Sequence, residues 1–191
     1  MENKIKRCSW CLGDTLYENY HDHEWGVPVH DEQRLFEFLI LESFQAGLSW
    51  ITILRKRENF RILFDQFDYK KVALFGAEKI KVLMTDHGII RNRQKIEAAV
   101  NNAQRFVDTQ NEHQSFSSYL WRFVEGIPIQ NNFNDPKAIP SKTKLSETIS
   151  KDLKQRGFQF VGPTVIYAFM QATGMVNDHL VDCFRYRSLQ S

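Results

Sequence analysis

The sequence predicts an all-α protein. Apolar residues recur at spacings of three and four along most of the 191-residue chain, which is the period of one face of a helix. Glycines follow several of these stretches, where a left-handed residue would end a helix. We find no strand-like alternation of apolar and polar residues, no internal repeat and no low-complexity tract.

Composition limits the classes of function. A hydrophobic fraction of 42% and an aromatic fraction of 13% can fill the core of one large domain or of two small lobes. The net charge of +2 permits contact with nucleic acid without requiring it. The sequence lacks a bilayer-length apolar run, and its opening residues MENKIKRC do not resemble a signal peptide, so we expect a cytoplasmic protein that binds no membrane. Three cysteines argue against a disulfide framework.

The first periodic helix carries a carboxylate in an apolar position. Short helices and loops are expected at 8–28, and Asp31 can cap the helix that follows. Counted from Leu35, Glu42 lies within the apolar stripe and is the single charge between residues 38 and 46. A lone buried carboxylate is costly unless it is paired, hydrogen-bonded or neutralised, so we expect a functional reason for it.

A break at Gly47 predicts a helix end, a short turn and a new helix capped by Ser49. That helix, at 49–64, is amphipathic, and its basic cluster at 55–57 is expected on a solvated face. The acid, the turn and the indole of Trp50 should therefore lie close together.

Residues 77–107 contain two helical patterns that meet at Gly88, which suits a left-handed position, while Ile89 can pin the short join to the core. The first amides of the second helix, which starts near residue 91, would be free to bind a phosphate. Three basic residues stand beside them: Arg91, Arg93 and Lys95. A helix-hairpin-helix element grips DNA in this way, although a plain helical hairpin with a solvated basic face is commoner.

The remaining segments predict further helices and two polar loops. Residues 108–118 and 130–144 are expected to be surface loops without function, around a helix at 119–124. Two more helices are expected at 145–156 and 163–173, each bounded by a glycine.

The two ends of the chain carry residues that can bind a metal ion. His179 and Cys183, four residues apart, would share one face of a helix. The other half is either Cys8 with Cys11, which spacing slightly favours, or Cys8 with His21. Either pair would close four ligands around a structural ion and clip the ends together. Alternatively, the cysteines are small buried hydrophobes and no metal binds.

Five aromatic residues are near Glu42 in sequence or can fold back on it: Trp10, Tyr17, Tyr20, Trp25 and Trp50. Core packing is the commoner role of such residues. Rings beside an isolated carboxylate also resemble a pocket in which a flipped nucleobase stacks and its amine donates to the acid.

Four blocks in order carry a resemblance to a known family. They are YHDHEWGVP (20–28), LESFQAGLSWITILRKRENF (41–60), GIIRNRQKIEAAVNNA (88–103) and GFQFVGPTVIYAFMQATGMVNDH (157–179). From Cys8 to about Cys183, the chain resembles the bacterial DNA-3-methyladenine glycosylase I (TAG) family of the helix-hairpin-helix glycosylase superfamily.

The resemblance implies a single unit, 1–191, of two helical lobes with DNA and the base pocket in the cleft between them. A helix-hairpin-helix would occupy about 78–105, and about 1–30 with 145–191 would form a terminal lobe tethered by zinc. The family's ligands for structural Zn²⁺ fall on four residues: Cys8, His21, His179 and Cys183. Cys11 matches no family ligand, so the preference from spacing is overruled.

The resemblance also implies site residues. The family's base-binding carboxylate falls on Glu42. The aromatic residues of its base pocket fall on Tyr20, Trp25 and Trp50, with Trp10 and Tyr17 beside them. The residues expected to contact DNA are Gly47 and Leu48, at a turn that enters the duplex, and Gly88, Ile89, Arg91 and Arg93 in the hairpin.

The implied activity is hydrolysis of the N-glycosidic bond of 3-methyladenine in alkylated double-stranded DNA by a monomer that flips the base and releases it. Methylation gives the base a positive charge and makes it a good leaving group, so the pocket must mainly extrude, select and admit water. Glu42 would read the base edge and offset its charge. Many relatives in the superfamily carry a catalytic aspartate beyond the hairpin, whereas the family that this chain resembles is an exception without one. We therefore expect Asp178 to cap the final helix and not to act in catalysis. The Gly88–Ile90 turn has no lysine, which implies no strand cleavage.

Two other functions are consistent with the residues alone. A zinc-clipped module without enzymatic activity would bind damaged DNA and release nothing. A metal hydrolase acting on nucleobases would need an open metal position, which four protein ligands do not leave.

Overall fold

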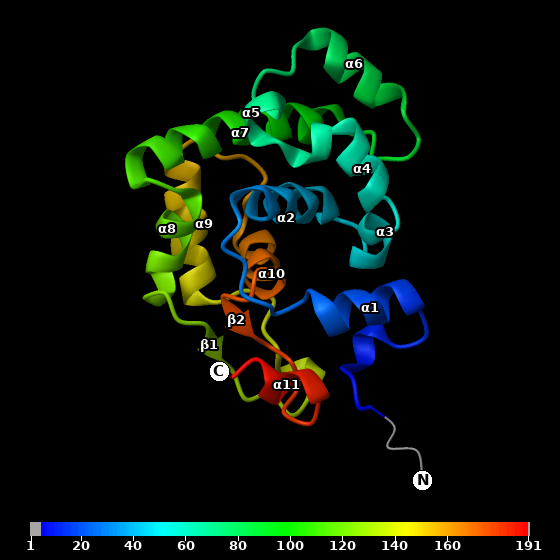
Figure 1. The fold of residues 1–191 in the computed structure, drawn as a ribbon, viewed down its shortest axis with the longest axis vertical. Helices are drawn as coiled ribbons and strands as arrows, with labels where there is room; N and C mark the ends of the chain where they lie inside the picture. The colour runs from blue at the N-terminus through cyan, green and yellow to red at the C-terminus, as the bar shows by residue number, and fades with distance from the viewer. Residues whose placement is uncertain (1–4, 191) are drawn as a thin grey trace.

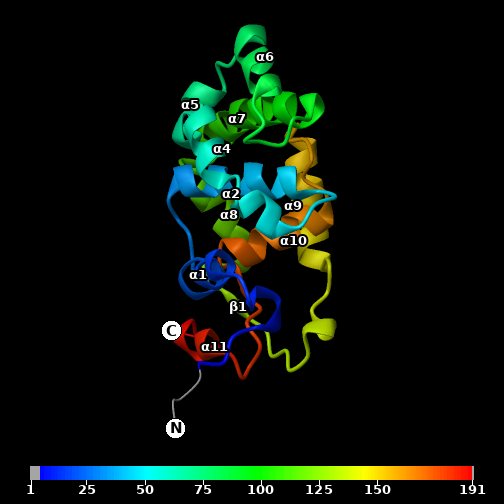
Figure 2. The same cartoon turned by 90° about the vertical axis from the view of Figure 1, so that its right-hand side faces the viewer.

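The computed structural model describes residues 5–190 and is mostly helical (Figures 1 and 2). Its α-helices are α1 Thr15–His23, α2 Glu32–Gln45, α3 Trp50–Leu54, α4 Arg57–Leu63, α5 Tyr69–Val72, α6 Ala77–Thr85, α7 Arg93–His113, α8 Phe116–Trp121, α9 Lys144–Gln155, α10 Pro163–Ala172 and α11 Phe184–Ser188. Short 3₁₀ turns are η1 Ser9–Cys11, η2 Asp65–Phe67, η3 Arg122–Val124 and η4 Pro136–Ala138. The predicted all-α class is confirmed, apart from a parallel pair of two-residue strands, β1 Ile129–Gln130 and β2 Val176–Asn177.

Helix α2 lies at the centre of the molecule, with α7 and α4 on one side and α10 on the other (Figures 1 and 2). It packs against α7, α8 and α10. Asp31 accepts a hydrogen bond from Arg34 N at 2.8 Å, so the predicted cap is confirmed. Every residue from Leu35 to Phe44 is buried. The predicted apolar stripe is therefore a helix enclosed on all sides, and any charge on it must be explained.

Both ends of the described chain lie at the same end of the molecule, beside α1 and α11 (Figure 1). Backbone hydrogen bonds join the N-terminal segment to the C-terminal one: Phe184 N donates to Lys6 O at 2.9 Å, and Gly26 N donates to Gln171 O at 3.0 Å. Gly174 has a φ of +70°, and a Cβ there would lie 2.4 Å from the backbone of Val27. The close approach of these two segments therefore requires glycine.

The turn after α2 follows the prediction, but the next helix does not. Gly47 has a φ of +84° and ends α2 as expected. The helix predicted at 49–64 is divided into α3 and α4 near Arg55. Ser49 is the N-cap of α3, yet its hydroxyl pairs with the Thr52 hydroxyl and not with a backbone amide.

The hairpin of α6 and α7 differs from the prediction in three respects. The join spans residues 86–92 and is not very short, and Gly88 is not left-handed. The Asn59 side chain occupies the space beside Gly88, because a Cβ there would lie 1.9 Å from Asn59 Nδ2 and that side chain would have to move. Helix α7 also continues through 108–113, predicted to be a loop, because its apolar face stays buried as far as Thr109.

Two basic residues expected beside solvent or phosphate are buried. Arg57 is 4% exposed and donates to Glu37 at 2.7 Å and to Glu24 at 2.8 Å, so it does not lie on a solvated face. Lys95 Nζ donates to Phe44 O at 2.9 Å and to the O atom of residue 46 at 2.8 Å. Lys95 therefore closes the C-terminal end of α2, where unpaired carbonyls attract a cation. Within residues 5–190, no helix has both the length and the apolar character to cross a bilayer.

We predict that Lys95→Met lowers the free energy of unfolding by about 1–3 kcal/mol, because a buried carbonyl and a partly buried one lose their donor. Urea denaturation measures the change. The control is Lys81→Met, at an exposed lysine that pairs with Glu78 on the surface, and it should change stability by less than about 0.5 kcal/mol. Equal effects of the two substitutions would refute the role given to Lys95.

Candidate functional site

A cavity of about 370 Å³ opens between the N-terminal segment, α2, α3 and α10. Its lining combines the five aromatic residues predicted from the sequence, Glu42 and six residues that were not predicted. The lining residues are Trp10, Tyr17, Tyr20, Trp25, Glu42, Gln45, Trp50, Pro136, Ile139, Pro140, Ala168 and Gln171. The fold therefore brings the predicted acid and rings to one place.

The aromatic residues form a continuous wall. Tyr20 and Trp50 have ring centroids 5.4 Å apart, and Trp10 lies 4.8 Å from Tyr17 and 5.0 Å from Trp25. Edge and tilted contacts of this kind fix the rings relative to one another. Flat faces held rigidly around a cavity can stack on a planar ligand without reorganising.

Glu42 lies in this cavity without a counter-charge. It is 4% exposed, and its Oε2 has no hydrogen-bond partner among the described residues. Burial alone raises the pKa of Glu42 to about 8. The indole Nε1 of Trp50 is also buried and unpaired in this part of the chain. The pocket thus holds a buried acceptor and a buried donor that the protein does not satisfy, which is unusual unless a ligand satisfies them.

Glu37, one and a half turns earlier on α2, shows the opposite treatment of a buried carboxylate. It is equally buried but accepts hydrogen bonds from Arg34, Arg57 and Arg61 at 2.7–2.8 Å. Burial would raise its pKa, yet the charge of Arg57 and the other guanidinium groups lower it below the usual value. The fold can therefore supply cations to a buried acid on α2, and it supplies none to Glu42.

A second cavity of about 200 Å³ lies under the turn that follows α2. Glu42, Gln45 and Ala168 line both cavities, so Glu42 stands between the aromatic pocket and the turn. Gly47 and Leu48 line the second cavity and are exposed. The two residues predicted to enter a duplex are thus adjacent to the predicted base pocket.

The unpredicted lining residues come from two sources. Gln45 lies three residues after Glu42 on α2, and helical spacing could have revealed it. Ala168 and Gln171 are likewise three apart on α10. Three others, Pro136, Ile139 and Pro140, belong to the loop expected to have no function. The sequence did not indicate this position, because loop 130–144 reaches the pocket through contacts that are distant in sequence.

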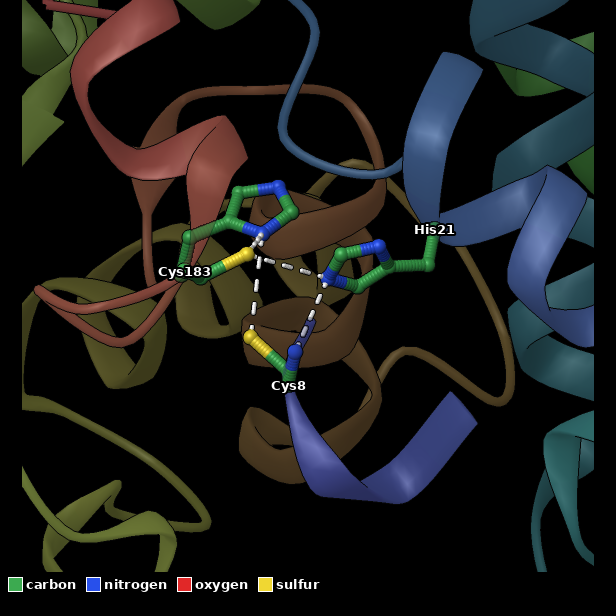
Figure 3. A group of neighbouring side chains, drawn as sticks. Cys8, His21 and Cys183 are labelled. Carbon is green, nitrogen blue, oxygen red and sulfur yellow. Dashed lines mark hydrogen bonds between the residues drawn. The ribbon is translucent and has the colours of Figure 1, made fainter. Parts of the chain in front are cut away.

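A second group of buried side chains lies beside the pocket. One ligand atom from each of four residues lies within 4.8 Å of the others: Cys8, His21, His179 and Cys183. Figure 3 shows Cys8, His21 and Cys183 converging on one point. Cys11 is not part of this cluster, and its thiol donates to the Cys8 carbonyl. The spacing preference for Cys11 was therefore wrong.

The geometry of the cluster fits a tetrahedral ion. Cys183 Sγ is 3.5 Å from His21 Nε2 and 3.5 Å from His179 Nδ1, and Cys8 Sγ is 3.7 Å from His179 Nδ1. Zinc–sulfur and zinc–nitrogen bonds of ordinary length would separate such atoms by about 3.6 Å. The hydrogen bond between the two thiols lowers the pKa of Cys183 and raises the pKa of Cys8, so Cys183 is the thiol of this pair that more readily becomes a thiolate.

Partners outside the cluster fix both imidazole rings. His21 Nδ1 is 2.8 Å from Asp22 Oδ1, and His179 Nε2 is 3.0 Å from the Trp25 carbonyl. These contacts turn the other nitrogen of each ring toward the cluster, as is usual for metal-binding histidines, and His21 Nε2 there accepts a 3.4 Å hydrogen bond from the backbone N of Cys8. The predicted placement of His179 and Cys183 on a helix was wrong. They lie in the loop between β2 and α11, and Cys183 is the N-cap of α11.

The cluster and the pocket share a wall. The ring of His179 lies 4.6 Å from that of Trp25, and the ring of His21 lies 5.3 Å from that of Trp10. An ion that orders the two histidines would therefore also order two aromatic residues of the pocket.

Other predicted residues lie outside the pocket lining. Arg91 and Arg93 are exposed, with Arg93 paired to Glu97 at 3.2 Å, whereas Ile89 is buried. Asp178 was expected to cap the final helix, and this expectation was wrong, because Cys183 is the N-cap of α11. Asp178 is buried and accepts three side-chain hydrogen bonds, because α10 and the loop 130–144 both pack against it.

A helical fold that surrounds a cavity with rings and a buried, uncompensated acid defines a protein that binds a planar, hydrogen-bond-donating ring such as a nucleobase. The comparisons with known proteins narrow this class. The sequence pattern of the methyladenine glycosylase family matches residues 10–186, and the chain belongs to this family.

Individual relatives match over nearly their whole length. The chain is 49% identical over 177 residues to the DNA-3-methyladenine glycosylase of Haemophilus influenzae, covering 93% of this chain and 96% of the relative. It is 48% identical over 182 residues to DNA-3-methyladenine glycosylase 1 of Escherichia coli, covering 95% and 97%. A solved structure concerning recognition of 3-methyladenine by 3-methyladenine DNA glycosylase I (TAG) of Staphylococcus aureus superposes with a TM-score of 0.91 at 40% identity, covering 94% and 96%. The resemblance seen in the sequence is thus confirmed.

We predict that Glu42→Gln stabilises the free protein more at pH 8 than at pH 5. The pKa of Glu42 is about 8 in the folded protein and ordinary in the unfolded chain. Between pH 5 and pH 8 the carboxyl group of Glu42 is ionised in the unfolded chain but still largely protonated in the folded protein. The wild type therefore loses stability as the pH rises, whereas the Glu42→Gln variant has no proton to release at this position and keeps its stability. The stability difference should grow by roughly 2–4 kcal/mol, measured by urea unfolding at both pH values. A difference that does not depend on pH would mean that Glu42 titrates normally.

Proposed function

We propose that this protein hydrolyses the N-glycosidic bond of 3-methyladenine in alkylated double-stranded DNA, after the base has turned out of the duplex into the aromatic pocket. The observation that carries the proposal is the buried, unpaired carboxyl group of Glu42 in a pocket of rings. The relatives named as 3-methyladenine glycosylases support the choice of base.

The charge of the substrate explains the state of Glu42. In the free protein, a pKa of about 8 keeps this carboxyl group largely protonated at neutral pH. A cationic base beside it lowers that pKa, because an opposite charge favours the carboxylate. The acid then pairs with the methylated base and not with neutral adenine. The rings of Tyr20 and Trp50 are 5.4 Å apart and tilted by 47°, which is too close to hold a base between them, so both would contact the base from the same side.

The chemical step needs little assistance from the protein. The bond from the sugar to the base breaks with its electron pair moving onto the positively charged base, which leaves as neutral 3-methyladenine. Water adds to the sugar carbon and loses a proton to solvent. The pocket contributes by binding this cationic leaving group in a fixed orientation away from its stacked neighbours.

The turn after α2 and the α6–α7 hairpin are proposed to hold the duplex. Gly47 and Leu48 would occupy the space that the base vacates, with Leu48 41% exposed for this contact. The hairpin, at about 78–105, would act as a helix-hairpin-helix in which free amides at the start of α7 bind a phosphate beside Arg91 and Arg93. Lys95 supports the turn from within, through its bonds at the end of α2.

We expect base removal without strand cleavage. None of the residues that line the pocket is a lysine. Lys95, in the first turn of α7, uses its ammonium group to bind two carbonyls, and such a charged, hydrogen-bonded amine is not a nucleophile. The protein is proposed to act as a monomer in the cytoplasm, where thiols such as those of its three cysteines stay reduced.

The cluster at the chain ends is proposed to hold a structural zinc ion. Two thiols and two imidazoles at tetrahedral distances are a donor set that zinc prefers. Four protein ligands leave no position for a substrate, so the ion would tether the ends of the chain and steady Trp10 and Trp25.

We predict that wild type releases 3-methyladenine from methylated duplex DNA, and that Glu42→Gln lowers release by more than about tenfold by removing a charge-assisted contact. Chromatography of released bases measures both. The control is Glu58→Gln, at an exposed residue outside the pocket, and it should behave as wild type. If wild type binds methylated DNA and releases no base, the protein is a damage-binding module and the proposal fails.

We predict that His21→Ala loses bound zinc and lowers the melting temperature, whereas Cys11→Ser retains both, because only His21 is in the cluster. Metal analysis and thermal unfolding of the purified proteins test this. Loss of zinc from Cys11→Ser with retention in His21→Ala would reverse the assignment. Loss of activity on mild chelation in a protein that stays folded would instead favour a catalytic metal.

A further inference from the structure

Gln171 lines the pocket near the end of α10, and one end of its side-chain amide is already engaged. Its Nε2 donates to Asp178 Oδ2 at 2.8 Å. A carboxylate accepts hydrogen bonds and donates none, so the nitrogen of this amide must face Asp178. The carbonyl oxygen, Oε1, is the other end of the amide, and no hydrogen bond reaches it from residues 5–190.

Asp178 is held in place by donors from two other segments. It is 1% exposed, and the Tyr167 hydroxyl donates to the same oxygen, Oδ2, at 2.7 Å. Asn131 Nδ2 donates to Oδ1 at 2.7 Å. A carboxylate fixed on both oxygens in a buried network cannot rotate away from Gln171. The network therefore fixes which end of the Gln171 amide is left over for the pocket.

The backbone places Gln171 beside the aromatic wall as well. Its carbonyl oxygen accepts a hydrogen bond from Gly26 N at 3.0 Å, which joins α10 to the residue after Trp25. Gln171 and Glu42 line the same cavity from α10 and α2 respectively. The cavity is thus lined by two residues that each have an acceptor oxygen left unpaired by the described residues: Glu42, which can carry charge, and Gln171, which is neutral.

Two acceptors match a base that carries an amino group. The exocyclic amine of 3-methyladenine has two N–H donors, whereas a base with a carbonyl at that position has none. Gln171 is half-buried in the free protein, and a bound base would cover its Oε1. An acceptor covered by a base that presents a carbonyl would lose its partner, and such mismatches discriminate strongly between ligands of similar shape.

We infer that Gln171 is a specificity-determining residue whose Oε1 accepts a hydrogen bond from the exocyclic amine of the bound base, and that Asp178 is a positioning residue that orients the amide. The inference rests on the proposed function, since it concerns the same pocket. It adds that selection of an amine-bearing base requires the network behind α10, in addition to Glu42.

The test compares Gln171→Met with wild type in calorimetric binding of free 3-methyladenine and of its N6,N6-dimethyl analogue, which has no N–H at the amine. Methionine keeps the length of the side chain and removes the acceptor. We expect Gln171→Met to bind 3-methyladenine about tenfold more weakly than wild type does. For the dimethyl analogue, we expect the affinities of wild type and Gln171→Met to agree within about twofold.

The possible results distinguish a failure of the role of Gln171 from a failure of the proposed function. Equal affinity of wild type and Gln171→Met for 3-methyladenine, or an equal loss for both ligands, would overturn the role of Oε1. Failure of wild type itself to bind 3-methyladenine would instead count against the proposed function. The two failures are therefore distinguishable.

Asp178→Asn tests the positioning role. Its amide can donate to Gln171 Oε1, which allows the glutamine to turn its nitrogen toward the pocket. We expect the ratio of affinities for 3-methyladenine over 3-methylhypoxanthine, which has a carbonyl in place of the amine, to fall at least about fivefold. An unchanged ratio would contradict the positioning role. If the variant does not fold, as circular dichroism would show, the Gln171→Met comparison still decides the inference.

Discussion

Helix α2 buries two carboxylates less than two turns apart, and the protein treats them in opposite ways. Glu37 is surrounded by three guanidinium groups, and its pKa lies below the usual value. Glu42 has no cation, and burial raises its pKa to about 8. The charge of Glu37 is already balanced by the arginines of the protein, so this acid stabilises the fold and needs no ligand. The charge of Glu42 is not balanced by the protein, so its carboxylate form is stabilised when a cation enters the pocket. The central position of α2 makes this difference possible, because it keeps water from both groups.

The rest of the molecule keeps that pocket rigid. Lys95 closes the end of α2 beside the exposed turn, and the network around Asp178 holds α10 against the opposite side. Two histidines of the buried cluster, His21 and His179, pack on Trp10 and Trp25 respectively. Joining the two ends of the chain therefore has a consequence beyond stability, because it fixes the rings that a base would contact.

Local patterns in the sequence predicted much of this arrangement, and long-range contacts account for what they missed. Glu42 was identifiable because its neighbours along one helix are apolar, and Gly47 because a turn needs its positive φ. By contrast, the burial of Arg57 depends on Glu24 and Glu37, which belong to two other elements. The loop 130–144 has a polar composition and still covers the pocket. Helical spacing likewise brought residues 179 and 183 together for the wrong reason, because they share the buried cluster although no helix joins them.

The most direct test of the account is the titration of Glu42 itself in the free wild-type protein, followed by carbon-13 NMR of its side-chain carboxyl group. We expect a midpoint near pH 8 for Glu42, and for Glu37 in the same spectra a midpoint below the ordinary value of a glutamate. A Glu42 midpoint at or below about 4.5 would contradict it, because such a carboxylate would already be compensated by the protein and would not need a cationic base.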